Sequence, residues 1–409
     1  MRNQNAKSLD WRKSGITLMA QFLLYLAISQ SLAAQTSYTV TDIGPLNDLN
    51  DPAPGAACIN NPGMVVGQAL LPAGPHRPFL WIKGNIFDLG TFGGPNGGAR
   101  GINAGGEVVG TADTAAVPEQ EHAFFWKDGV MHDLGTLGGD SSVANSINNG
   151  GWTAGAADTT IPDPTGTIGP TENHAFLWRL DGALQDLGTL GGPNSHAISI
   201  NDNGMIVGWS QVEFAIGAFG IPDLHPAMWV HGVPARLPDL GGSVSLALSV
   251  NNNGTAVGQS FLADDSAFYA VMWQKGKLRN LGAVGDDVLS SASSINKWGD
   301  VVGFSITTSF ASRAFLWRKG VMTDLNTLIP ANSGWVLQSA GHINDVGQIV
   351  GFGVPNGNLH AFLLTAIPAG DRTGSATTPP APIQLSDAML RSLAWEKWRF
   401  LKHGSTWIK

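Results

Sequence analysis

The residues best suited to chemistry in this sequence are a recurring histidine and a recurring aspartate. The histidine begins short apolar segments such as His174-Ala-Phe-Leu-Trp178, and the aspartate follows in the motif Asp-Leu-Gly. An imidazole beside a carboxylate can bind a metal ion or transfer a proton, so each pair is a candidate for metal or acid–base chemistry. The pairs are His122 with Asp133, His174 with Asp186, His225 with Asp239, and His360 with Asp42 at the other end of the repeats.

Substitutions at these positions favour a structural role. Arg77 and Arg313 replace the histidine in two segments, and arginine is not a zinc ligand. In a third segment Tyr269 stands at the histidine position and Asn280 at the aspartate position, so donor and acceptor change together. We therefore predict cross-strand donor–acceptor pairs that hold each repeat together, with no metal, no cofactor and no catalytic residue among them.

A second group of candidates lies in the two longest connections of the repeat region, residues 156–173 and 209–224. Binding residues concentrate in such variable connections on a regular scaffold. Two interpretations stay open for their acidic and aromatic side chains: solvated loop residues, or a binding surface for a glycan, a peptide or Ca²⁺. The residues are Asp158, Asp163, Glu172, Trp209, Glu213, Phe214, Phe219 and Asp223.

Signatures of catalysis are missing from the sequence. It contains no G-x-S-x-G, H-E-x-x-H, EF-hand or Walker pattern. Repeated Gly-Gly pairs such as Gly138-Gly139 lack the following helix and the Lys-Ser/Thr of a phosphate-binding loop, so they indicate turns. The tryptophan that ends most apolar segments fits core packing better than a row of sugar-stacking platforms.

All these residues belong to a repeat whose clearest mark is the motif Ile/Val-Asn-x-x-Gly. The motif recurs at intervals of roughly 43 to 53 residues, a period typical of a propeller or a solenoid. Its Asn-x-x-Gly part suits a tight hairpin, because glycine supplies a positive φ and asparagine bonds to nearby backbone. The seven asparagines are Asn60, Asn103, Asn148, Asn201, Asn251, Asn296 and Asn344.

Each repeat divides into four short strands, and four antiparallel strands form the blade of a β-propeller. The seventh repeat lacks its fourth strand, whereas residues 38–44 match that strand and have no first three before them. We therefore predict an all-β fold: a seven-bladed propeller over residues 35–367, closed by the N-terminal strand completing the last blade. A solenoid would need capping repeats instead. The variable connections should share one face, and the short turns the other.

Composition limits the partners and the redox chemistry of this chain. The 409 residues carry a net charge of −8, with basic residues concentrated at both ends, and an acidic body argues against nucleic-acid binding. Cys58 is the only cysteine, so no intramolecular disulfide can form. A small buried core thiol is the expected role of Cys58.

The two ends of the chain depart from the repeat. Residues 1–34 have a basic start, an apolar run and a small-residue exit, which is typical of a signal peptide cleaved near Ala33 or Ala34; a membrane anchor is the alternative. A Pro/Thr/Ala-rich linker follows the repeats at 368–384, and an amphipathic helix and tail are expected over 385–409. That helix could dock on the propeller, contact a partner or the cell envelope, or fray.

The recurring segments HAFLW, DLGTLGG and IN-x-x-G-x-VVG resemble the HAF-repeat family of extracellular bacterial proteins. The resemblance covers roughly residues 38–365 and rests on three motifs in the same order and spacing. It implies a secreted bacterial protein and carries no catalytic residue across, because these motifs are structural. The fifth unit departs from the pattern, with Tyr269-Ala-Val-Met-Trp273 in place of HAFLW.

Together these features predict a monomeric, non-enzymatic binding or scaffold module. It should be secreted to the exterior, or alternatively to the periplasm, and bind a glycan, a peptide or a cell-envelope component. Two rivals remain. One is a propeller enzyme acting on polysaccharide through carboxylates on the variable-loop face. The other is a purely structural surface or matrix protein.

Overall fold

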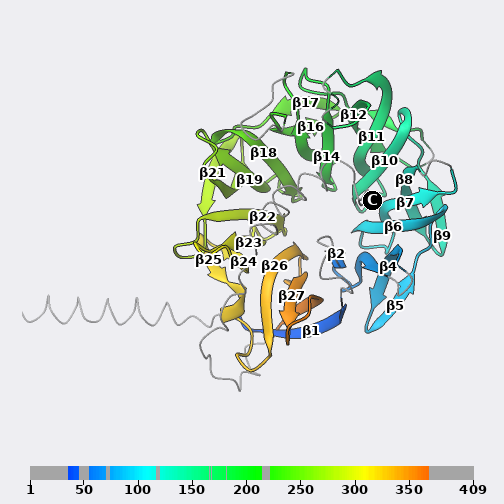
Figure 1. Cartoon of the computed structure of the whole chain (residues 1–409). Coiled ribbons are helices and arrows are strands. Elements are labelled where there is room, and N and C mark those ends of the chain that lie inside the picture. Colours follow the sequence, from blue (N-terminus) through cyan, green and yellow to red (C-terminus); the bar gives the residue numbers. More distant parts are fainter. Residues whose placement is uncertain are drawn as a thin grey trace, which may run out of the picture.

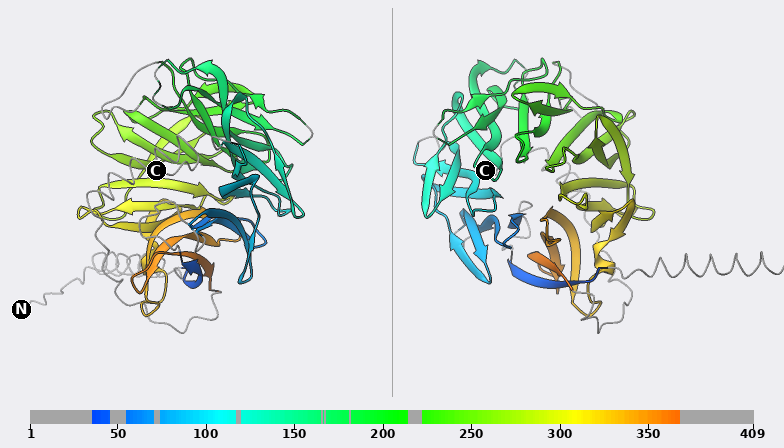
Figure 2. Two further views of the ribbon diagram at one scale, coloured as in Figure 1. Left: turned by 45° about the vertical axis from the view of Figure 1, so that its right-hand side comes forward. Right: turned by 180° about the vertical axis from the view of Figure 1, so that it is seen from behind.

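Seven four-stranded antiparallel sheets form a closed ring of blades in the computed structural model of the protein (Figure 1). The structure describes residues 36–45, 55–70, 74–116, 120–164, 166, 168–180, 182–213 and 222–367. The right-hand view of Figure 2 shows the same ring of blades from behind. The prediction of an all-β, seven-bladed propeller is confirmed.

The strands follow one another from the innermost to the outermost position of each blade. The first three blades contain β2 (Gly55–Ile59), β3 (Val65–Leu70), β4 (His76–Ile82) and β5 (Asn85–Asp88); β6 (Gly93–Ile102), β7 (Val108–Thr114), β8 (Glu121–Lys127) and β9 (Val130–Asp133); and β10 (Gly138–Ile147), β11 (Thr153–Pro162), β12 (Thr171–Trp178) and β13 (Gln185–Asp186).

The remaining blades repeat this order. They contain β14 (Ser195–Ile200), β15 (Ile206–Ser210), β16 (His225–Val230) and β17 (Val233–Arg236); β18 (Gly241–Val250), β19 (Ala256–Leu262), β20 (Phe268–Gln274) and β21 (Lys277–Gly282); β22 (Leu289–Ile295), β23 (Val301–Ile306), β24 (Ser312–Arg318) and β25 (Val321–Asp324), followed by the 3₁₀ turn η1 (Leu325–Thr327); and β26 (Trp335–Ile343), β27 (Ile349–Pro355), β28 (His360–Ala366) and β1 (Tyr38–Pro45).

The strand nearest the N-terminus closes the ring. β1 pairs antiparallel with β28, from Tyr38 opposite Ala366 to Pro45 opposite His360. Tyr38 is fully buried, and its backbone N–H donates to the carbonyl oxygen of Leu328. Closure in this way pairs an edge that an open array would expose. β1 lies next to the orange strands of the last blade in Figure 1.

A glycine in the second strand lets the two inner strands of a blade approach closely. The inner strand carries a β-bulge, as between Ala340 and His342 in β26. Opposite this bulge, a Cβ atom added to Gly351 would overlap the carbonyl oxygen of Ser339. A residue with a side chain cannot occupy this position without displacing backbone. The same overlap occurs at Gly110, Gly155, Gly208, Gly258 and Gly303.

The recurring tryptophans of the third strands pack in the core. Trp229 is fully buried, and its indole N–H donates to the carbonyl oxygen of Leu187 at 3.1 Å. Trp273 donates in the same way to Pro238 at 2.6 Å. A hydrogen-bonded indole stabilises a buried position that would otherwise leave one donor unpaired.

Several sequence-based predictions fall on parts of the chain outside the described residues. These are the signal peptide, the linker and the C-terminal helix. Within the residues that are described, no helix is long and apolar enough to cross a membrane.

Candidate functional site

The structure brings each of the four predicted histidine–aspartate pairs together across the hairpin of the two outer strands. In the second blade, His122 Nδ1 lies 2.8 Å from an Asp133 oxygen, and the Gly135 N–H donates to the same carboxylate at 2.8 Å. The corresponding distances are 2.9 Å for His174–Asp186, 3.4 Å for His225–Asp239 and 2.8 Å for His360–Asp42.

The same outer hairpins hold the arginine variants of this pair. Arg77 lies 3.2 Å from Asp88, and Arg313 lies 3.2 Å from Asp324. Arginine therefore serves the same carboxylate as histidine does elsewhere, which a metal site would not allow. In the fifth blade Asn280 keeps the bond from the Gly282 N–H, at 2.8 Å.

In the third blade, the charges of His174 and Asp186 stabilise one another. Burial raises the pKa of Asp186, but the hydrogen bonds from His174 and the Gly188 N–H outweigh it and lower the value overall. Burial lowers the pKa of His174, whereas Asp186 and Glu172 raise it by more. Both ring nitrogens of His174 face carboxylates, with Glu172 at 3.4 Å. Such a pair fixes the local structure of the two outer strands.

The first long connection is shorter than predicted, because Asp158 lies in β11 and Glu172 in β12, and of the three predicted residues only Asp163 lies between these strands. Asn173 donates to Asp158 at 2.9 Å, and the fully buried Asn194 donates to Asp163 at 3.0 Å. The Asn194 side-chain oxygen accepts the Asn173 N–H at 2.8 Å. Two of the predicted ligand-binding residues, Asp158 and Asp163, therefore join one network that ties the third blade to the fourth.

The second connection packs against the first, since Trp209 and Leu224 share a core cluster with Ile168. Trp209 lies inside β15 and is 1% exposed, so it is a core residue where the sequence suggested a loop surface. Glu213 is exposed and close enough to Asp223 to help raise its pKa, although burial is the main cause of that shift. Phe214 and Phe219 lie outside the described residues.

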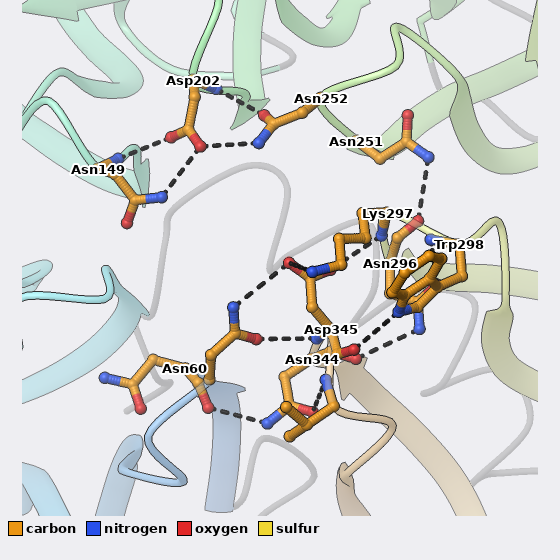
Figure 3. Close-up of polar contacts among 12 residues, drawn as sticks. Asn60, Asn149, Asp202, Asn251, Asn252, Asn296, Lys297, Trp298, Asn344 and Asp345 are labelled. Carbon is orange, nitrogen blue, oxygen red and sulfur yellow. Dashed lines mark hydrogen bonds and ion pairs between the residues drawn. The ribbon is translucent and has the colours of Figure 1, made fainter.

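The opposite face carries a closed ring of hydrogen bonds that sequence reasoning missed. We call it the Asn-turn face, formed by the Asn-x-x-Gly turns and by the turns between third and fourth strands. The side-chain N–H of each recurring asparagine donates to the backbone carbonyl of its counterpart in the next blade, at 2.9–3.3 Å. Figure 3 shows part of this ring, including Asn251, Asn296, Asn344 and Asn60. The bond from Asn344 to Asn60 closes the ring.

Every ring asparagine also shapes its own turn. The Asn251 side-chain oxygen accepts the N–H groups of Asn253 and Thr255, both at 3.1 Å. Asn251 is 7% exposed and Thr255 is 4% exposed, so the bond between them satisfies groups that water does not reach. Asparagine recurs at the same turn position in every repeat, and this could have indicated the ring. Its role within the turn, however, already explained the recurrence.

The residues one or two positions after the ring asparagines form a second layer, exposed except for the half-buried Asp345. We call this layer the axial patch: Asn61, Asn149, Asp202, Asn252, Lys297, Trp298 and Asp345. Its members are linked between blades, since Asp202 accepts the Asn149 N–H at 2.9 Å and Asn252 accepts the Asp202 N–H at 2.9 Å (Figure 3). Carboxylates and amides at this surface can hydrogen-bond to a polar ligand.

Trp298 is the aromatic member of the axial patch. Its side chain is 71% exposed, yet its indole N–H donates to the carbonyl oxygen of Asp345 at 2.9 Å (Figure 3). The Lys297 ammonium lies 4.9 Å from the ring centroid. The ring is thus held in a defined orientation with its apolar surface open to solvent, beside a carboxylate and amides. An exposed indole is exceptional here, since nine other tryptophans of the described chain are buried or half-buried.

Near the propeller axis, a buried relay links three blades. Arg100 donates to the Asn145 oxygen at 3.3 Å, and the Asn145 N–H groups donate to His196 Nε2 and to the carbonyl of Ala197, both at 2.8 Å. His196 is 3% exposed. Burial, and secondarily the Arg100 charge, lowers its pKa from 6.5 to about 3. His196 is therefore neutral wherever the protein is folded near neutral pH.

This depressed pKa predicts acid sensitivity. Below pH 6.5 the unfolded chain binds a proton at His196 that the folded chain does not, so stability falls as pH decreases. We expect the wild type to lose about 2 kcal/mol at this residue between pH 7 and pH 5, and His196→Gln to lose much less. Urea midpoints at both pH values measure the difference. Identical pH slopes in the two proteins would contradict the assignment.

Cys58 is buried, as predicted, but it has an ionisable neighbour. The thiol lies against the imidazole of His342, where the seventh blade meets the first. Burial raises the pKa of Cys58, but the contact with His342 outweighs it and lowers the value overall.

Comparisons with known proteins concern the fold alone. No family model and no curated protein sequence matches the chain. Among solved structures, a lectin from Burkholderia pseudomallei is 10% identical, with a TM-score of 0.40 over 86% of this chain and 99% of the lectin. A gluconolactonase from Xanthomonas campestris is 11% identical, with a TM-score of 0.36 over 78% of this chain and 99% of that chain.

A puromycin-hydrolysing peptidase from Mycobacterium tuberculosis is also similar, at 12% identity and a TM-score of 0.46 over 82% of this chain and 56% of the peptidase. These similar structures include both binding proteins and enzymes. Such distant likenesses leave the activity of this chain to be argued from its own residues.

Proposed function

We propose that this protein is a secreted, non-enzymatic binding module of the HAF-repeat type, and that it binds a glycan at the axial patch of the Asn-turn face. The observation that carries the proposal is the exposed Trp298 ring, held by Asp345 among hydrogen-bonding side chains. Sugars present a C–H face that stacks on an aromatic ring and hydroxyl groups that bond to carboxylates and amides. Trp298, Asp345 and Asn61 offer this combination.

The rest of the site chemistry favours recognition over catalysis. Carboxyl groups with a raised pKa are what a polysaccharide-cleaving enzyme would need. Asp158, Asp223 and Asp287 have a raised pKa, mainly from burial, but they come from different blades. Asp158 bonds to Asn173, and Asp287 lies 3.1 Å from Arg313. Within the described chain, no three His, Cys, Asp or Glu residues gather closely enough to hold a metal.

An array of bacterial envelope glycans, followed by calorimetry with the strongest hit, tests the proposal. We expect Trp298→Ala to weaken binding at least about 30-fold, the size expected when an anchoring tryptophan is truncated. Phe310→Ala is the matched control, because Phe310 is an exposed aromatic residue in the connection between β23 and β24, on the variable-loop face. It should bind like the wild type.

Two results would contradict this proposal. Equal affinity of Trp298→Ala and wild type would remove the axial patch from the binding surface. Binding lost equally in both variants would point to the variable-loop face. The measurements are made with Ca²⁺ and with chelator, so that a cation requirement is seen directly.

A further inference from the structure

Three lysines of the Asn-turn face occupy a backbone conformation that disfavours them. Lys83, Lys275 and Lys319 each begin a two-residue turn between the third and fourth strands, with φ of 48°, 51° and 50°. The glycines that follow them also have positive φ. Turns with two positive φ values strongly prefer Asn-Gly or Asp-Gly, because a Cβ atom disfavours positive φ and the short polar side chains of Asn and Asp compensate by hydrogen-bonding locally. Backbone strain of this kind concentrates at functional positions.

These lysines are not held there by ion pairs. All three are exposed, and no carboxylate in the described parts of the chain lies within salt-bridge distance of their ammonium groups. Lys127 differs, because its turn begins at the next residue and its ammonium lies 2.8 Å from Glu107. Local turn chemistry and local pairing therefore both fail to explain the three lysines.

Exposed apolar side chains accompany the cations. Val321 follows the Lys319 turn and is 63% exposed, and Ile86 follows the Lys83 turn and is 53% exposed. Val130 and Val233 occupy the position of Val321 in other blades, at 53% and 66%, whereas Ile86 lies one residue farther along its strand. Nearer the axis, Val346 is 62% exposed. Together with Trp298, these residues give the Asn-turn face a set of apolar side chains between its cations.

The variable-loop face has the opposite charge. Its connections and the strand ends beside them carry many acidic residues, among them Asp113, Asp140, Asp158, Asp163, Glu172, Glu213, Asp223, Asp264, Asp265, Asp286 and Asp287. A disc with one acidic face turns its other face toward an anionic surface, because repulsion of the acidic side and attraction of the lysines act in the same direction.

We propose that the Asn-turn face docks the propeller on an anionic lipid surface. Lysine ammonium groups would contact lipid headgroups, while the neighbouring Val and Ile side chains and the Trp298 ring enter the interfacial layer. A soluble acidic polymer would use the lysines but not the apolar side chains. The placement of both kinds of residue on one face therefore favours lipid. This inference does not depend on glycan binding.

The test is the triple variant Lys83→Asn, Lys275→Asn, Lys319→Asn in the full-length chain. Sedimentation with vesicles of phosphatidylcholine and phosphatidylglycerol measures binding. We expect the triple variant to bind about 100-fold more weakly than wild type, since each lysine near an anionic surface contributes roughly a factor of five. Its thermal midpoint should be unchanged or higher, because asparagine fits these turns better. A triple arginine variant should bind like the wild type.

Opposite results overturn the proposal. Three results would show that the lysines do not dock the protein on anionic lipid. The wild type could fail to bind the vesicles, the wild type and the asparagine variant could bind equally, or the wild type could bind pure phosphatidylcholine equally well. Binding to dextran sulfate without binding to vesicles would identify a soluble polymer instead. The asparagine variant should keep the affinity of the wild type for any glycan bound at Trp298, so the two proposals fail separately.

Discussion

Replacing Gly351 by alanine is expected to destabilise the propeller by at least about 3 kcal/mol, or to prevent folding. The added Cβ would overlap the carbonyl oxygen of Ser339 and lie 2.8 Å from the Phe362 ring. Flexible side chains can move away from such a contact, but Ser339 contributes backbone that is paired in the sheet. The inner strand would have to separate from the second strand, and this would remove ladder bonds and core packing together.

A control within the same blade separates close approach from a general intolerance of substitution. Gly341 sits at the bulge of β26, has no positive φ, and would bring a Cβ no nearer than 3.6 Å to any atom. Gly341→Ala should therefore stay within about 0.5 kcal/mol of wild type. Urea unfolding followed by tryptophan fluorescence compares the two. If both variants unfold at the wild-type midpoint, the close approach at Gly351 is not a constraint.

The architecture was predictable because one repeat occurs seven times in the sequence. Seven copies of one turn motif gave the number of blades, and the unmatched strand at Tyr38 gave the closure. The partners His360 and Asp42 were predictable although the whole repeat region separates them, because each fills its place in a repeated hairpin. A repeated motif places residues at equivalent positions in every blade, so their pairing can be predicted without coordinates.

The candidate site was not predictable in the same way. The seven asparagines were assigned to local turns, and nothing in one sequence position shows that its side chain reaches the next blade. Trp298 stands at a variable position of a short, regular turn, whereas the predicted binding residues all came from the long connections. Trp209 was assigned to a loop because β15 continues to Ser210, two residues beyond the Val-Gly motif that marks the end of the predicted strand. Side-chain direction and strand length are tertiary properties.

The acidic residues of the variable connection show the converse limit. Asp158 and Asp163 had the composition of a binding loop, and composition does not tell an anchored loop from an open one. The structure uses both carboxylates to accept bonds from Asn173 and Asn194. Buried polar groups need such partners, so acidic side chains at a long connection that packs on a blade serve as hydrogen-bond acceptors there.

The ring of asparagines leads to the second large expected effect. Asn251→Ala removes the bond to the Asn296 carbonyl and leaves two backbone N–H groups, those of Asn253 and Thr255, without their acceptor. The Asn296 carbonyl and the Thr255 N–H are buried, and each such group that loses its partner costs about 1–3 kcal/mol, so we expect a loss of about 3 kcal/mol in the free energy of unfolding. Local geometry and the contact between blades fail together, because one side chain serves both.

The adjacent residue provides the matched control. Asn252 is exposed and bonds to Asp202 across the neighbouring boundary, between the fourth and fifth blades. Water can replace those bonds, so Asn252→Ala should cost less than about 1 kcal/mol. Equal unfolding free energies of the two variants would mean that the buried ring contributes no more than the exposed layer above it. A larger loss for Asn251→Ala would establish that the ring holds the blades at fixed spacing, which is the condition for presenting Trp298 and the three turn lysines on one rigid surface.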